Sequence, residues 1–340
     1  MKEGRISEPI WKRSVLKRIK NRRSEVWQRA SGGNVGSILS MVEGNMVVSA
    51  EADFLISLSA GSDLSARILL HRAVNGCAAM GAEPVAVQFQ LLCPADFTEP
   101  DLRNVICGME EEAGKLGVSL LPGRIEVSLA VKMPYLTLSG IGSQKQTGQE
   151  SLSGQSLSDG QPCAGQDLLV TKWIAMEASV QLASIYEKEL LKRFTPVFVS
   201  HMKEFFLHIS AVSDAKAAFR HHAVAVLPIE EGGIFGALWE LAEEAGLGLE
   251  VDARAIPVKQ ETIEICELLH RNPYQLPSAG SLLIAAKNGE HVRQKLLAEG
   301  VPAVVIGRLT EGRDRILFHE EERRFLELPN YGGLFGEKEE

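Results

Sequence analysis

The sequence predicts a mixed α/β protein built from two domains of similar size. Two stretches in which strand-like and helix-like hydrophobic patterns alternate are separated by a segment that is almost free of apolar residues. A chain of 340 residues is also longer than most single hydrophobic cores, which favours two domains. With 45% hydrophobic and 24% charged residues, the composition is that of an ordinary globular protein, so each half can bury a core.

The first half begins with an amphipathic helix and continues as alternating strands and helices. Trp11, Val15, Leu16 and Ile19 recur at helical spacing, which predicts a helix over 10–26. Helical patterns follow at 66–80 and 99–116, and strand-like patterns lie at 45–50, 85–92, 118–121 and 125–131.

The second half repeats this alternation after a polar connection. Residues 142–165 are rich in Gln, Ser and Gly, which is typical of a flexible connection without a core of its own. We therefore predict an N-terminal domain at 1–145, a linker at 146–166, a C-terminal domain at 167–330 and a tail at 331–340. Within the C-terminal domain we expect strands at 167–173, 223–228, 247–253, 281–286 and 303–309, and helices at 176–192, 213–221, 233–245 and 291–299.

Charge and cysteine usage exclude several classes of protein. The 36 basic and 44 acidic residues give a net charge of −8, which argues against binding to a nucleic-acid backbone. No apolar run approaches the length of a membrane span, and the first twenty residues are charged, so we expect a cytoplasmic protein without membrane association. The five cysteines are odd in number and never form C-x-x-C, which indicates reduced thiols instead of disulfides or a zinc site.

Several long stretches resemble one protein family. EEGGIFGALWELAEEAGLGLEVDARAIPVKQETIEICE, SAGSLLIAA and VVIGRLTEGRDRIL in the second half, with HRAVNGCAAMGAEPVAV in the first, are similar to the PurM/HypE superfamily, which includes HypE-type hydrogenase maturation factors and AIR-synthase-related proteins. The resemblance implies a PurM-like fold whose N-terminal sheet pairs with that of a second subunit, giving a homodimer. It also implies ATP and Mg²⁺ as cofactors, a small-molecule or nucleotide ligand, and a maturation protein as partner.

The family motifs of the N-terminal domain are altered here. The acidic residue of the family's G-x-G-E-D-x-A turn is replaced by Val35, which cannot coordinate Mg²⁺. The T-D-P aspartate corresponds to Asp53 or, as the alternative, to Glu51. The N-D pair becomes Asn75 followed by glycine. The resemblance thus implies Asp53 and Asn75 as nucleotide-site residues.

A further motif of this domain, H-T-E-V, reads Arg124, Ile125, Glu126, Val127. Glu126 could meet a metal or a phosphate-bound water, or it could simply face solvent, since strand alternation alone does not decide. Arg124 could supply positive charge to a phosphate in place of a metal. The expected metal ligands are therefore Asp53 and Glu126.

The C-terminal motifs are also only partly kept. In T-K-x-x-G-x-E-G, Lys172 survives while both glycines become alanine, at Ala175 and Ala178. In D-V-T-E-G-G, Glu231, Gly232 and Gly233 survive while the aspartate and threonine are lost. The resemblance implies that Lys172, Glu231 and this glycine pair contact the nucleotide. The glycine pair opens a helix and presents backbone N–H groups.

Two functions fit these departures. The first is a degenerate paralogue that keeps the fold and dimer and acts as a binding or maturation-associated protein. The alternative is an active ATP-dependent enzyme that works by phosphoryl transfer. HypE itself acts through a cysteine at its extreme C-terminus, whereas no cysteine follows Cys266 here, so we do not expect cyanide-ligand synthesis.

Overall fold

The computed structural model describes residues 4–5, 12–20, 23, 26–28, 38–39, 45–56, 63–144, 161–320, 322–327 and 334. The chain divides into two compact units. Unit 1 contains residues 1–78 and 82–146, and unit 2 contains residues 79–81 and 147–340. Each unit holds its own sheet and helices, so the predicted mixed α/β class is confirmed, and each is described by itself.

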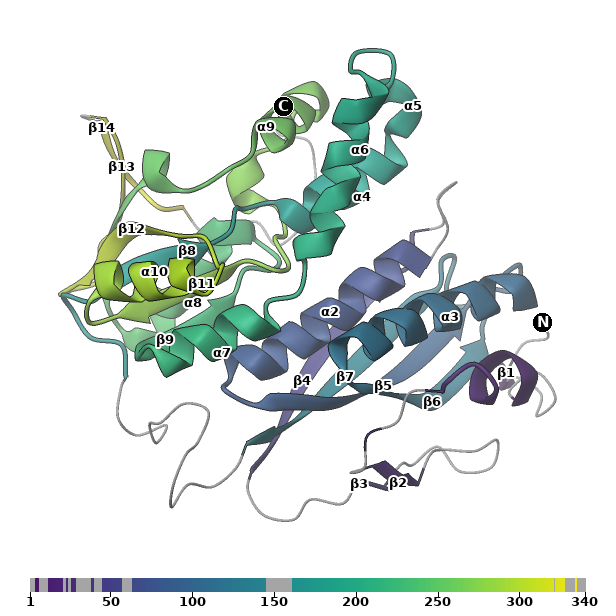
Figure 1. Cartoon of the computed structure of the whole chain (residues 1–340). Coiled ribbons are helices and arrows are strands. Elements are labelled where there is room, and N and C mark those ends of the chain that lie inside the picture. Colours follow the sequence, from purple (N-terminus) through teal and green to yellow (C-terminus); the bar gives the residue numbers. More distant parts are fainter. Residues whose placement is uncertain are drawn as a thin grey trace. The chain divides into compact units, whose positions relative to one another are not determined.

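Unit 1 is a five-stranded sheet with two long helices on one face (Figure 1). The helices are α2 (Asp63–Ala79) and α3 (Glu99–Leu116), preceded in the chain by the short helical turn η1 (Lys12–Leu16). A two-stranded ribbon pairs β2 (Val26–Gln28) with β3 (Ile38–Leu39). The main sheet has the order β1 (Gly4–Arg5), β6 (Ser119–Val127), β5 (Glu83–Cys93), β7 (Tyr135–Gln144) and β4 (Asn45–Phe54), and only β5 and β6 are parallel.

Small residues let α2 approach this sheet closely. A Cβ atom on Gly140 of β7 would overlap the backbone carbonyl oxygen of Ala73 and the Oγ of Ser49, and one on Gly76 of α2 would lie 3.1 Å from the Ser49 Cβ. The Ser49 hydroxyl donates a hydrogen bond to the Ala73 carbonyl oxygen at 2.5 Å. Any larger side chain at Gly140 would push the helix off the sheet, so its glycine is required by packing.

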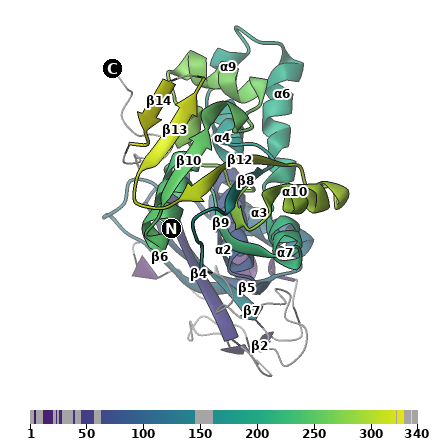
Figure 2. The same cartoon turned by 90° about the vertical axis from the view of Figure 1, so that its left-hand side faces the viewer.

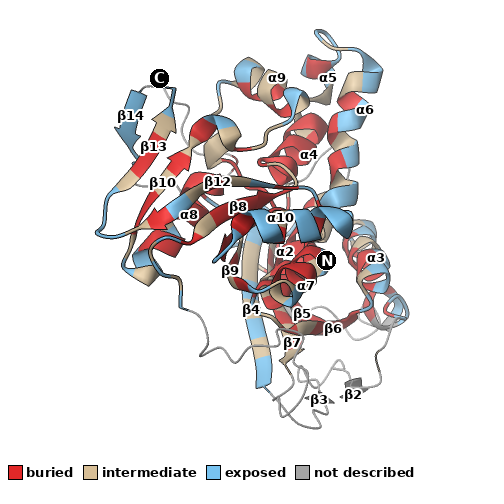
Figure 3. Cartoon of the chain, turned by 60° about the vertical axis from the view of Figure 1, so that its left-hand side comes forward, coloured by how far each residue is buried: buried red, intermediate tan, exposed pale blue. Residues whose placement is uncertain are grey.

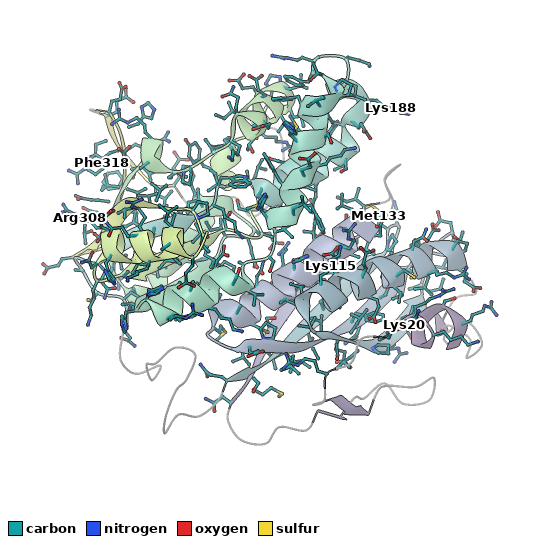
Figure 4. The ribbon with its side chains drawn as sticks, in the orientation of Figure 1. Lys20, Lys115, Met133, Lys188, Arg308 and Phe318 are labelled. Atoms are coloured by element: carbon teal, nitrogen blue, oxygen red, sulfur yellow. The ribbon has the colours of Figure 1, made fainter. Side chains whose placement is uncertain are left out.

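An ion network joins α2 to α3. The Glu112 carboxylate accepts hydrogen bonds from Arg67 at 2.7 Å and from Lys115 at 3.0 Å, and lies 3.2 Å from the His71 Nε2. Figure 4 labels Lys115 on α3. Burial pushes the pKa of Glu112 up, but hydrogen bonds from His71, Lys115 and Arg67 outweigh it and hold that pKa at about 2. Burial lowers the pKa of His71 below its ordinary value of 6.5.

Unit 2 is built on a seven-stranded sheet (Figure 2). Helices α7 (Val212–Arg220) and α10 (Gly289–Ala298) contact β11 (Leu282–Ala286) and its neighbours. Helix α8 (Gly233–Ala245) also contacts β11 and contributes to a hydrophobic core cluster of this unit. The strand order is β14 (Glu322–Phe325), β13 (Arg315–His319), β10 (Gly248–Asp252), β12 (Ala303–Thr310), β8 (Asp167–Thr171), β11 (Leu282–Ala286) and β9 (Ala223–Pro228). The α-helices are α4 (Met176–Ile185), α5 (Glu187–Leu190), α6 (Pro196–Glu204), α7 (Val212–Arg220), α8 (Gly233–Ala245), α9 (Gln260–Leu269) and α10 (Gly289–Ala298), and short 3₁₀ turns are η2 (Phe205–His208), η3 (Ala253–Ala255) and η4 (Pro273–Gln275).

Burial varies from strand to strand in both sheets. In the second sheet Figure 3 shows β8 as buried, and its neighbour β11 is buried along its whole length; in the first sheet much of the edge strand β4 is exposed. Among the described residues, no helix combines the length and the hydropathy of a membrane span.

Most predicted elements are present, with several corrections. The helix at 99–116, the strand at 223–228 and the helix at 233–245 are confirmed with the predicted bounds. The predicted helix over 10–26 is wrong in its extent, because the described part is the turn η1 and Val26 already belongs to β2. The two strands expected at 118–121 and 125–131 form the single strand β6, and the helix over 176–192 breaks at Tyr186 into α4 and α5. The hydrophobic patterns did not predict the strands β1, β3, β7, β13 and β14 or the helices α6 and α9.

Candidate functional site

Strand β4 places the two alternative acids of the T-D-P position, Glu51 and Asp53, on the same face of the sheet, since they are two residues apart. Glu51 is mostly buried and forms an ion pair of 2.7 Å with Arg72 of α2. Asp53 is exposed, and its Oδ1 accepts a hydrogen bond of 2.7 Å from the Phe54 backbone N–H. The two acids therefore occupy different environments, one paired with a buried guanidinium and the other open to solvent.

Asn75 lies on α2, fully buried. Its neighbour Gly76 packs against Ser49 of β4, whereas Arg72, one helical turn earlier, reaches Glu51. Residue numbers therefore fall along α2 as they rise along β4, so the two elements are antiparallel. Each two-residue step along β4 corresponds to about one turn of α2. By this register Asn75 lies level with Ser49, and Asp53 lies about two turns further along the helix. The fold does not bring Asn75 and Asp53 to one point.

Arg124 and Glu126 lie on the other face of the same sheet. The register pairs Asp53 with Leu136, Leu136 with Leu91, and Leu91 with Ile125, and these apolar partners are all buried. Because in-register neighbours share a face, Glu126 points to the opposite side from Asp53. The Arg124 guanidinium forms an ion pair with the Glu126 carboxylate.

A hollow of ≈ 240 Å³ surrounds this second pair. It is lined by Gln90, Leu91, Leu92, Arg124, Glu126, Tyr135 and Thr137 of β5, β6 and β7. Arg124 is 61% exposed and Glu126 30% exposed, so both side chains remain accessible to a ligand or to a second protein. Their predicted contact with a nucleotide stays a prediction.

The described donors do not fit a magnesium site. Mg²⁺ requires several oxygen ligands in near-octahedral geometry. Within the described ranges no three His, Cys, Asp or Glu side chains are grouped so that they could hold a metal. The two expected ligands, Asp53 and Glu126, occupy opposite faces of one sheet, and Glu51 is paired with Arg72. The altered turn at 33–37 lies outside the described residues.

In unit 2, Lys172 is held in place by its surroundings. Its Nζ donates hydrogen bonds to the carbonyl oxygens of His208 at 2.9 Å, Ser210 at 2.7 Å and Gly280 at 3.1 Å. It also lies 2.9 Å from the Oδ2 of Asp214, and the two side chains are only 10% and 3% exposed. The ammonium group is thus surrounded by oxygens of the protein. Its predicted contact with phosphate would require some of these bonds to break.

The segment after Lys172 keeps the backbone shape of a glycine-containing turn. Lys172 and Ala175 both adopt φ of 55°, in the left-handed region that favours glycine. Ala175 N–H donates a hydrogen bond to the Ser278 Oγ at 2.5 Å. Glu177 is buried, and its carboxylate accepts a hydrogen bond of 3.2 Å from the Ala279 N–H. The alanine at the family's glycine position therefore holds a conformation that costs about 1 kcal/mol or more for a residue with a Cβ.

Gly232 and Gly233 form the tight entry to α8. Their φ values are 80° and 61°, and a Cβ atom on Gly233 would lie 2.5 Å from the Tyr274 carbonyl oxygen. Gly233 is required because the η4 backbone passes close to this turn. A hollow of ≈ 170 Å³ beside it is lined by Leu227, Pro228, Glu230, Glu231, Ala237 and Glu240. The carboxylates of Glu230, Glu231 and Glu240 in this lining would repel a phosphate. The nucleotide contact of Glu231 stays a prediction.

The sequence analysis did not single out two charged residues near these positions, Arg72 and Asp214. Arg72 stands in the run ILLHRAV, where a buried arginine inside an apolar helical pattern indicates a buried acidic partner. Asp214, the partner of Lys172, carries no comparable signal, because an aspartate in the first turn of a helix is ordinary capping chemistry.

Sequence comparisons identify related proteins for both units. A family model for the AIR synthase related protein, N-terminal domain, matches residues 37–143, and one for its C-terminal domain matches residues 169–320. The chain is 24% identical over 280 residues to a putative hydrogenase expression/formation protein of Methanocaldococcus jannaschii, covering 79% of this chain and 77% of the relative. It is 24% identical over 289 residues to the carbamoyl dehydratase HypE of Rhizobium leguminosarum bv. viciae, covering 83% and 78%.

Solved structures share the architecture. The hydrogenase maturation protein HypE in complex with ATP aligns with a TM-score of 0.71 at 16% identity, covering 96% of both chains. A chain of the HypE–HypF complex aligns with a TM-score of 0.61 at 17% identity, covering 85% of this chain and 92% of that chain. Likeness at these identities concerns the fold, and the expected two-domain PurM-like fold is confirmed.

Proposed function

Since the chain belongs to the AIR synthase related protein family, we propose that it is a HypE-like, maturation-associated protein that binds ATP with weakened or lost magnesium-dependent chemistry. ATP binding is supported by the likeness to the ATP complex of HypE. The weakened chemistry is supported by one observation above all, that Asp53 and Glu126 lie on opposite faces of one sheet. Phosphoryl transfer depends on metal ions that neutralise charge on the phosphates, and a separated pair of acids does not hold one.

Calorimetry together with a turnover assay tests this proposal. Full-length protein titrated with ATP is expected to release heat with a dissociation constant in the micromolar range. The same preparation incubated with ATP and Mg²⁺ is expected to release no ADP or AMP above the background of a heat-denatured control. ATP binding with steady turnover would instead establish the alternative, an active ATP-dependent enzyme. Absence of binding would refute the nucleotide role.

A homodimer formed through the open face of the first sheet belongs to the same proposal. That face carries Met46, Val48 and Phe54 of β4, which are 55%, 54% and 43% exposed, and the Phe54 ring lies 4.8 Å from that of Tyr135. An exposed apolar row on a sheet is commonly covered by another protein surface. Isologous pairing of this face with a second copy would bury it.

Sedimentation velocity distinguishes a dimer from a monomer. The V48E variant places a charge in the middle of the apolar row and is expected to sediment as a monomer, while the wild type sediments as a dimer. Val304 of β12 is also exposed, in unit 2, so V304E is the matched control and is expected to remain dimeric. A monomeric wild type would refute this part of the proposal.

The partner and the cellular location are further parts of the proposal. The likeness to a chain of the HypE–HypF complex supports a hydrogenase maturation protein as partner. The cytoplasmic location stays a prediction from the sequence.

A further inference from the structure

Glu51 of β4 and Arg72 of α2 form a buried ion pair between the first sheet and its helix. The Arg72 guanidinium lies 2.7 Å from the Glu51 Oε2, with the two side chains 4% and 12% exposed. The pair is positioned by close packing, because one turn along α2 Gly76 lies against Ser49 of the same strand.

This arrangement bears directly on a metal ion at Glu51. A divalent cation bound to this carboxylate would lie within a few ångströms of the Arg72 guanidinium, and the low-dielectric surroundings would strengthen their repulsion. Displacing Arg72 would leave a buried guanidinium without its carboxylate, which is strongly unfavourable. Glu51 carries a charge of −1 and Arg72 a charge of +1, so the pair is neutral. A phosphate near the pair is therefore not repelled by an uncompensated carboxylate, and no metal ion is needed to neutralise Glu51.

We propose that Arg72 takes the place of a divalent cation beside Glu51, so that the N-terminal domain takes a phosphate-bearing ligand without Mg²⁺. The inference rests on the proposed nucleotide-binding function and adds the form of its ligand, a metal-free nucleotide. It assigns Arg72, a residue outside the altered family motifs, as the group that neutralises the Glu51 carboxylate.

Two measurements on the full chain test the inference. The first is the ATP dissociation constant by calorimetry in excess Mg²⁺ and in EDTA. The second is the number of Mn²⁺ ions bound, counted by electron paramagnetic resonance with and without ATP. Both are made on the wild type and on E51Q/R72Q, which removes both charges and keeps a pair that can hydrogen-bond. The matched control is R220Q/E299Q, which removes an Arg–Glu pair of the same 2.7 Å separation in unit 2.

The expected result is that ATP affinity in EDTA stays within about threefold of that in Mg²⁺, a difference of well under one order of magnitude in the binding constant. The wild type, E51Q/R72Q and the control are expected to bind the same number of Mn²⁺ ions. The inference is overturned by a Mn²⁺ ion that the wild type binds and E51Q/R72Q loses, or by a loss of ATP affinity in EDTA greater than about threefold.

The outcome for ATP and the outcome for the metal are independent. If no preparation releases heat with ATP, the proposed function fails, and the comparison of bound Mn²⁺ still decides whether Glu51 is a metal ligand. Thermal unfolding of E51Q, R72Q and the double variant checks the pair itself. Each single variant is expected to lower the melting temperature more than the double variant does, because it leaves one buried charge unpaired. Additive losses would contradict the pairing and with it the inference.

Discussion

The charged residues of the family motifs have different kinds of partner in the two units. In unit 1 the acids Glu51 and Glu126 are each paired with an arginine, Arg72 and Arg124, and they lie on opposite faces of one sheet. In unit 2 the surviving lysine, Lys172, is enclosed by three carbonyl oxygens and an aspartate. Unit 1 therefore neutralises its acids pairwise, whereas unit 2 uses its lysine to join three segments.

The difference shows that a residue can survive in a family motif for reasons of stability. Gly233 is needed because η4 crosses over it, and Lys172 because an unpaired Asp214 would be buried without compensation. Residues that support the fold are retained even where ligand chemistry changes, since the core around them still depends on them. Resemblance at these positions is thus stronger support for the fold than for the activity.

The largest effect is expected from removal of the Lys172 charge. K172M keeps most of the unbranched apolar stem but leaves Asp214 and three carbonyl oxygens without the ammonium, which should lower the free energy of unfolding by about 3–5 kcal/mol. Urea denaturation followed by tryptophan fluorescence measures this loss, since Trp173 and Trp239 lie in unit 2. The K172M/D214N double variant should lose less. A loss below about 1 kcal/mol in K172M would show that the lysine is free, as the family's phosphate contact would require.

Gly233 and Gly246 provide a matched pair that separates backbone strain from crowding. Both have positive φ, 61° and 66°, but a Cβ on Gly233 would overlap the η4 backbone, whereas that on Gly246 would enter open space. G233A should destabilise unit 2 by about 3 kcal/mol or more, the sum of strain and overlap. G246A should cost only about 1 kcal/mol. Equal losses in urea denaturation would mean that η4 moves away freely.

Acid is expected to weaken unit 1 through the network between its helices. The pKa of Glu112 in the folded protein is about 2, below its ordinary value of 4.5, so its contribution is complete above pH 4.5 and is lost as the pH falls toward 2. The pKa of His71 is lowered by burial, so stability also declines as the pH falls below 6.5, where the unfolded state gains the proton first.

Urea denaturation across this pH range measures both effects. The E112Q variant should lose the step between pH 4.5 and 2, and H71Q should lose the step that begins near 6.5. A wild-type stability that does not change between pH 7 and pH 3 would contradict both assignments.

The sequence predicted most of the fold because the patterns that determine it are local. The helix at 99–116 begins with Thr98 and Pro100 and ends before Gly117, and each of these is a direct helix-boundary signal. The strand β7 was missed because its sequence, YLTLSGIGSQ, runs into the polar segment that was interpreted as a linker. Gly140 in this strand allows the close approach of α2, and the sequence of the strand alone does not show that contact.

The candidate site was less predictable because it depends on pairing between distant elements. Which face Glu126 occupies follows only from the register of β6 with β5 and of β5 with β7. Alternation places Glu126 opposite Ile125 but does not say which of the two faces carries the helices. The Glu51–Arg72 pair joins residues 21 positions apart, and no local pattern specifies such a contact.

The smallest expected loss of stability comes from the exposed Arg124–Glu126 pair of the first sheet. Its comparison with the buried Arg72–Glu51 pair tests the effect of burial within one sheet. R124Q and R72Q make the same change in two Arg–Glu pairs, but Arg124 is 61% exposed and Arg72 only 4%. R124Q should lower the free energy of unfolding by less than about 1 kcal/mol, since water screens an exposed pair. R72Q should lower it by about 3 kcal/mol or more, because Glu51 is left buried without its partner.

Urea denaturation of both variants at several protein concentrations completes this comparison. In a monomer the loss in R124Q does not depend on concentration. If the open face is covered by a second copy, the midpoint of the wild type rises with protein concentration, and a substitution at Arg124 that weakens the contact reduces that rise. A loss in R124Q as large as that in R72Q at every concentration would contradict the assignment of Arg124 to an exposed face.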